Sequence, residues 1–130
     1  MKRRANLKTS LVTAFTSAYL LGATIQSVRQ GDAEFFLYAF VVLLLGLMTL
    51  SLHQHFRFPT ALLWCLSIWG LMHLLGGLLH IPETWPRQGV NSVLYNAWII
   101  PGFIRYDNIV HAYGFSLLTW GAWRCLLPRL

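Results

Sequence analysis

The sequence predicts an all-α membrane protein with four transmembrane helices in a single domain over residues 1–130. The composition is the first reason: 56% of the residues are hydrophobic and only 11% are charged, whereas a soluble domain carries about 25% charged residues. The second reason is the presence of four long apolar stretches. A helix needs roughly 20 residues to cross a bilayer core, and each stretch has about that length. We therefore expect the lipid bilayer as a partner and exclude a soluble enzyme, a disordered tail and a nucleic-acid binder, despite a net charge of +6.

The first two spans are predicted over residues 9–28 and 34–52. The basic start Met1–Arg4 is similar to a secretory signal. A signal peptide, however, has an apolar core of about 7–15 residues and a cleavage site of small residues. The apolar stretch is longer here, and Ser27–Gln30 has no such site. We interpret this segment as a retained helix.

The third span is predicted over residues 60–81, after a short connection from His53 to Pro59. Two prolines then prevent the helix from continuing, and a long connection follows. Its segment 91–104 is too apolar for an ordinary loop and too short to span. Because its aromatic residues favour the membrane interface, we expect a short interfacial helix there. The fourth span is predicted over residues 109–127.

The basic residues predict the orientation, since cytoplasmic loops carry an excess of lysine and arginine. With the N-terminus inside, seven positive charges fall on the cytoplasmic side and three on the outer side. All four acidic residues also fall outside. The sequence therefore predicts that both termini are cytoplasmic. The cytoplasmic set is Lys2, Arg3, Arg4, Lys8, Arg57, Arg124 and Arg129, and the outer set is Arg29, Arg87 and Arg105.

Four ionisable residues in or beside the last two spans are the candidate site: His73, His80, Asp107 and His111. Such groups are costly in a membrane and usually face a partner or a cavity. Helical spacing puts the two histidines of the third span on one face with two glycines, and Asp107 and His111 on a similar face of the fourth. Glycines let another backbone approach closely, so we expect the two faces to meet near the outer leaflet.

Three interpretations of this site stay open. The polar groups could only bond across a closely packed helix pair. They could bind a divalent metal such as zinc, iron or manganese, for which imidazole and carboxylate are suitable ligands. Alternatively, His73 and His111 could hold a b-type haem, or line a quinone pocket, between facing helices. Beside them, Arg105 and Tyr106 are candidate contacts for an anion or lipid headgroup, and Arg105 could equally pair with Asp107.

Two segments resemble an uncharacterised bacterial inner-membrane family of the YjdF type. They are Leu71–Gly77, with a His-x-x-Gly-Gly pattern, and Arg105–His111, with a Tyr-Asp-x-x-x-His pattern. The similarity covers roughly residues 70–116, and family members are commonly longer, with more spans. The resemblance implies a bacterial inner membrane, and it implies that His73, Asp107 and His111 belong to one functional unit. It supplies no substrate.

The sequence does not name a reaction. We expect a membrane protein whose His/Asp site binds a divalent metal; if it is catalytic, metal-activated water would hydrolyse or modify a lipid-like substrate at the outer leaflet. The alternatives are a non-enzymatic accessory or scaffold subunit and a haem- or quinone-binding electron carrier. A homo-oligomer or a larger membrane complex is compatible with the glycine-rich faces.

Overall fold

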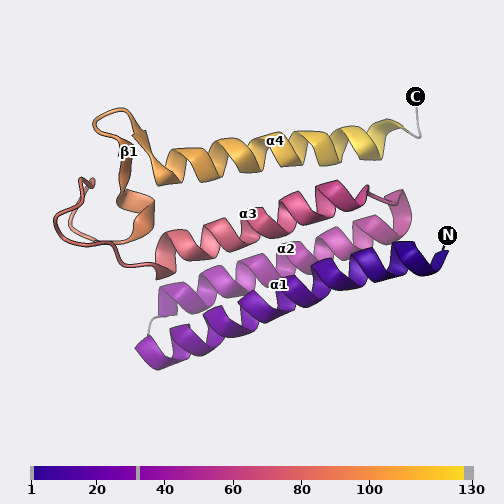
Figure 1. Ribbon diagram of the computed structural model, residues 1–130, viewed down its shortest axis with the longest axis horizontal. Helices are drawn as coiled ribbons and strands as arrows, with labels where there is room; N and C mark the ends of the chain where they lie inside the picture. The colour runs from indigo at the N-terminus through magenta and orange to yellow at the C-terminus, as the bar shows by residue number, and fades with distance from the viewer. Residues whose placement is uncertain (1, 32, 128–130) are drawn as a thin grey trace.

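The computed structural model describes residues 2–31 and 33–127 as four long helices lying side by side, with a compact connecting segment at one end (Figure 1). Successive helices run in opposite directions, so α1 begins and α4 ends at the same end of the bundle. The elements are α1 (Lys2–Gln30), α2 (Ala33–Phe56), α3 (Thr60–Leu78), the 3₁₀ turn η1 (Leu94–Asn96), β1 (Trp98–Ile100), β2 (Ile104–Arg105) and α4 (Tyr106–Leu126).

Three of these helices are long and apolar enough to cross a membrane: Leu7–Gln30, Phe35–Phe56 and Thr60–Leu78. The prediction of a mostly helical membrane protein is confirmed to that extent. The fourth helix, α4, has 21 residues, with polar side chains along it and charged ones in its first and last turns, and it is not among the helices that qualify. Of the charges that predict the orientation, Asp32, Arg129 and the side chains of Lys2–Arg4 and Glu34 lie outside the described residues.

Helix α2 continues one turn further than its predicted span. His53 and His55 lie in its last turn rather than in the connection, where imidazoles are well placed beside the carbonyl end of a helix. The helix ends because Arg57 has a positive φ of 49°, and Pro59 then begins α3 as its N-cap. The true connection is therefore only the three residues 57–59.

Helix α3 ends at Leu78, three residues before the predicted end of the third span. The residue before a proline disfavours helical backbone, and here Ile81 precedes Pro82. The extended backbone is bonded to the connecting segment instead: Ile81 N–H donates to Ser92 at 2.8 Å, and Leu94 N–H donates to Leu79 at 2.9 Å. His80 pairs with Val93 in a β-bridge, so it does not share a helical face with His73.

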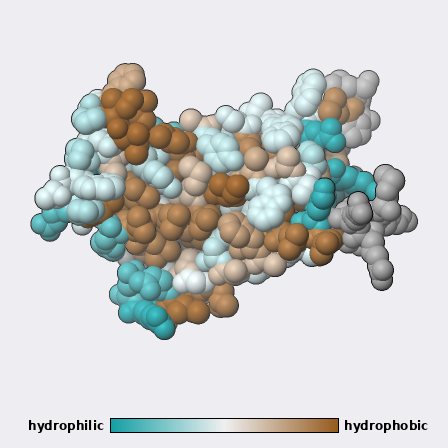
Figure 2. Space-filling view, in the orientation of Figure 1, coloured by the Kyte–Doolittle hydropathy of each residue, from teal (hydrophilic) through white to brown (hydrophobic). Residues whose placement is uncertain are grey.

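The prediction of an interfacial helix over residues 91–104 is wrong. This segment forms η1 and a two-stranded antiparallel hairpin of β1 and β2, with a turn that contains Gly102 at φ +74°. Pro101 removes a donor and Gly102 takes a left-handed conformation, and both features favour a turn over a helix. The tip exposes Ile99, Ile100 and Phe103, and Figure 2 shows it as a hydrophobic patch above one end of the bundle.

The helices are joined by apolar packing and by a few side-chain bonds to backbone carbonyls. One buried cluster contains Leu62, Leu63 and Leu117, and a second is centred on Leu74. Between α3 and α4, Trp69 Nε1 donates to Val110 at 3.0 Å. Such bonds matter because lipid chains are as apolar as leucine and give little hydrophobic drive for helices to associate.

Candidate functional site

A cavity of about 810 Å³ lies at the end of the bundle beneath the connecting segment. Four of the predicted site residues line it: His73 from α3, His80 just beyond that helix, and Asp107 and His111 from α4. Arg105 lines it as well, and the surface of the cavity is mostly polar. The cavity is completed by α2, by Gly77 of α3 and by the connecting segment; the residues from α2 and the connecting segment are Phe35, Tyr38, Val90, Asn91, Ser92, Val93, Tyr95 and Asn96.

His73 is held in place by Tyr95 of η1. The tyrosine hydroxyl donates to the His73 carbonyl oxygen at 2.8 Å and lies 2.6 Å from His73 Nδ1. A hydroxyl has one proton to donate, so both contacts are satisfied when Nδ1 carries a proton and donates it to the tyrosine oxygen. We assign that tautomer, in which Nε2 of His73 is the ring nitrogen left with a free lone pair.

The Tyr95 ring lies directly on Gly76. A Cβ atom added at Gly76 would come within 2.5 Å of the tyrosine ring, and one at Gly77 would come within 3.2 Å of Phe35. The glycine pair therefore makes room for aromatic rings. Burial raises the pKa of the Tyr95 hydroxyl well above its usual value, with smaller contributions from the negative charges that Tyr38, Asp107 and Tyr106 carry when ionised. Tyr95 is consequently a stable hydrogen-bond donor at physiological pH.

His111 is held in the same way by its own helix. Its Nδ1 lies 3.0 Å from the Asp107 carboxylate and 2.9 Å from the Asp107 carbonyl oxygen, so Nδ1–H donates and Nε2 is again free. The carboxylate lies in the first turn of α4, where the helix dipole favours negative charge. Arg105 approaches the same carboxylate at 3.7 Å. Asp107 therefore orients His111 and lies within ion-pair distance of Arg105.

The distance between the two imidazole rings is within the range found when two histidines share one ion. Their ring centroids are 6.2 Å apart and their planes are inclined at 74°. A metal bound at about 2.0–2.1 Å from Nε2 lies roughly 3 Å from the ring centroid, so rings that share an ion are about 5–6.5 Å apart. Within residues 2–31 and 33–127, however, no three histidine, cysteine, aspartate or glutamate side chains form a group that could hold a metal. The predicted set of four ligands is not assembled as one.

Other predicted features have different roles from those expected. Tyr106 does not line the cavity; its hydroxyl donates to the Met72 carbonyl at 2.9 Å and ties α4 to α3. The glycines admit rings rather than a neighbouring backbone: a Cβ at Gly70 would lie 2.7 Å from the Tyr19 hydroxyl, and one at Gly114 would lie 2.6 Å from Trp69. Gly121 has open space around it.

Sequence reasoning missed the residues that shape the site from a distance in the chain. Tyr95 is one of the aromatic residues of segment 91–104, and it lies 22 residues from His73, which it positions. Trp69 and Tyr38 also contact the His73 ring, with centroids 5.9 and 6.0 Å away. The spacing of Trp69 and His73, one helical turn apart, was an available signal; the position of Tyr95 depends on how the connection folds.

No known family model, curated protein or solved structure matches this chain. The resemblance to the YjdF-type family therefore stays a prediction, and the function must be argued from the geometry.

Proposed function

We propose that this chain is an integral membrane protein that binds one divalent metal ion between Nε2 of His73 and Nε2 of His111. The observation that carries the proposal is that both imidazole rings are fixed through Nδ1, which leaves Nε2 of each ring free. Each Nδ1 is bonded to an oxygen partner, each ring lines the same cavity, and the centroids are 6.2 Å apart. Metal-binding histidines characteristically donate their other nitrogen to a carboxylate, a carbonyl or water, which fixes the tautomer.

In this proposal Asp107 is a positioning residue rather than a ligand. Its carboxylate already bonds Nδ1 of His111 and pairs with Arg105. Two imidazoles leave several coordination positions for water or a ligand, and the 810 Å³ cavity has room for both. His80 lines the same cavity, but among the described residues it does not form a group of three ligands with the other two histidines. The site suits zinc, iron or manganese.

We also propose that α4 is a fourth membrane span and that both chain ends are cytoplasmic, in a bacterial inner membrane. Its 21 residues give a length of about 31 Å, which matches a bilayer core of about 30 Å. The helix packs along α3 through the buried residues Val110, Gly114 and Leu117. Lys8, Arg57 and Arg124 lie toward the end where the chain begins, as the positive-inside rule requires.

Metal binding is tested on the full chain purified in detergent and stripped with a chelator. Titration with Zn²⁺ or Mn²⁺, followed by calorimetry and elemental mass spectrometry, should give one ion per chain. His73→Ala and His111→Ala should abolish binding, and Asp107→Asn should weaken it about 10–100-fold through loss of orientation. His55→Ala is the matched control, because His55 is exposed at the other end of the bundle.

Equal binding by the wild type and both alanine variants, all with native helical circular dichroism, would refute the site. An absorption spectrum of the untreated protein is recorded first. A haem Soret band that is lost in His111→Ala would show that the histidines hold a haem iron instead of a bare ion. This result would overturn the proposal. No metal and no haem in a well-folded protein would leave the histidines as packing residues of a scaffold subunit.

A further inference from the structure

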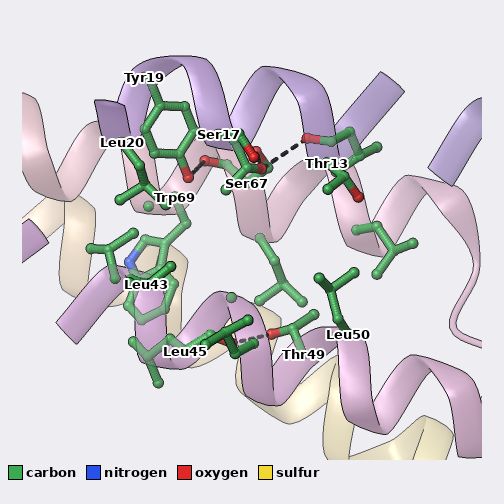
Figure 3. A pocket seen from close by; sticks show the side chains of 18 of the residues that line it. Thr13, Ser17, Tyr19, Leu20, Leu43, Leu45, Thr49, Leu50, Ser67 and Trp69 are labelled. Atoms are coloured by element: carbon green, nitrogen blue, oxygen red, sulfur yellow. Dashed lines mark hydrogen bonds between the residues drawn. The ribbon is translucent and has the colours of Figure 1, made fainter. Parts of the chain in front are cut away.

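A second cavity, of about 230 Å³, lies between α1, α2 and α3 in the body of the bundle. Its surface is mostly apolar. Figure 3 shows Tyr19 and Ser67 along one side, Leu45 and Thr49 along the other, and Trp69 beside Leu43 between them. On α3 it extends from Leu63 to His73, ten residues that correspond to about 15 Å along the helix axis. The cavity is thus long enough for an extended hydrocarbon chain of medium length.

Three of the hydroxyl groups beside this cavity, those of Thr13, Tyr19 and Thr49, are already bonded within the protein. Thr13 donates to Thr9 at 3.0 Å and Thr49 to Leu45 at 2.8 Å, both carbonyl oxygens one turn back in the same helix. Tyr19 donates to the Ser67 carbonyl at 3.1 Å. A water in a cavity needs two to four polar partners, and these donors have theirs inside the protein. The cavity therefore favours an apolar occupant.

His73 lines both cavities. One residue thus separates a mostly apolar space in the membrane interior from a mostly polar space at the end of the bundle. Gly70, one turn before His73 on α3, lines only the apolar cavity, and Gly77, one turn after it, lines only the polar one. The lining along α3 thus changes from apolar to polar at His73. This change matches an amphiphile whose apolar chain lies on one side of His73 and whose polar head lies on the other.

We propose that the protein binds a single-chain amphiphile with a compact anionic head, such as a carboxylate or phosphate. The chain occupies the cavity between α1, α2 and α3, and the head occupies the cavity of His73 and His111. This inference rests on the proposed function, because the head completes the coordination of the ion held by the two imidazoles. Arg105, which lines the polar cavity, provides a positive charge near the head.

Gly46 offers a direct way to fill the apolar cavity without disturbing the helices. It lines that cavity, and a Cβ added there would meet nothing within 4 Å. Gly46→Leu should therefore fold and place its side chain where the amphiphile chain lies. Gly22→Leu is the matched control, because Gly22 also has open space around it and does not line the cavity.

The probe is dodecanoic acid brominated near the middle of its chain, at the level expected for Trp69, added to the zinc-loaded protein in detergent. Bromine quenches nearby tryptophan, and Trp69 lines the apolar cavity, so the Trp69→Phe variant identifies the signal of that residue. The wild type and Gly22→Leu should show the same saturable quenching. Gly46→Leu should raise the Kd about tenfold or more, the effect of denying space to roughly two methylenes.

Equal quenching in Gly46→Leu and Gly22→Leu would overturn the proposal, because the probe would then be dissolved in detergent or bound elsewhere. Repeating the measurement with a chelator distinguishes failure of the metal site from failure of the amphiphile site. If metal binding fails but Gly46-sensitive quenching persists, the proposed ion is wrong, and with it the coordinated head, while the chain cavity stands. If one ion binds and no Gly46-sensitive quenching is seen, the metal site stands and the amphiphile is refuted.

Discussion

At the scale of single residues, Tyr95 is the part of the site that gives His73 a defined state. A histidine in an apolar helix could present either ring nitrogen to a ligand. The tyrosine contacts at 2.6 and 2.8 Å remove that freedom. The sequence made His73 and Asp107 conspicuous because ionisable groups are scarce here. It could not single out Tyr95, since a tyrosine in an apolar loop is common and its partner is distant in the chain.

The Tyr95 hydroxyl should titrate well above the usual pKa of a tyrosine. Burial raises the pKa of its hydroxyl, so tyrosinate absorbance that disappears in Tyr95→Phe should arise well above the usual value of about 10. Between that value and the raised pKa, the unfolded chain releases a proton that the folded chain keeps, so stability falls as pH rises. Alkaline absorbance titrations and melting curves of both proteins check this. A Tyr95 step at the ordinary pKa would contradict the buried contact with His73.

At the scale of elements, the helices were largely predictable and the connecting segment was not. Long apolar runs determine where a helix can lie in a membrane, and three such helices are present. The end of α3 depended on a competition between helix and loop. Backbone bonds from residues 79 and 81 to the connecting segment decided it, and hydropathy does not record such bonds. The hairpin likewise follows from Pro101 and Gly102, a turn signal hidden in an apolar run.

Gly76→Ala should damage the site without touching a ligand. The added Cβ would lie 2.5 Å from the Tyr95 ring, and this ring is fixed by its bonds to His73. We expect a loss of about 1–3 kcal/mol, typical of overpacking, together with weaker metal binding. Thermal unfolding in detergent measures the first effect and the titration measures the second. Gly22→Ala, which has open space around it, should not lower stability; equal effects of both would point to helix propensity instead.

At the scale of the whole molecule, alternation of the four helices places the start of α1 and the end of α4 at one end of the bundle and the site at the opposite end (Figure 1). Charge patterning predicted which end faces the cytoplasm, and labelling can test it. In a variant with Cys65 and Cys125 replaced by alanine, Gln88→Cys should react with an impermeant thiol reagent in intact cells. Gln54→Cys, exposed at the other end, should react only after permeabilisation. The reverse pattern would invert the proposed orientation.

The early end of α3 also affects the surrounding lipid. With 19 residues, α3 is about 28 Å long, whereas the 29 residues of α1 extend about 43 Å. A bilayer core of about 30 Å matches the shorter helix, so the longer one must tilt or protrude. His73 is five residues from the end of α3, about 7.5 Å along the axis. Because membrane thickness differs between lipid compositions, the distance from this histidine to water is set partly by the lipid in which the protein resides.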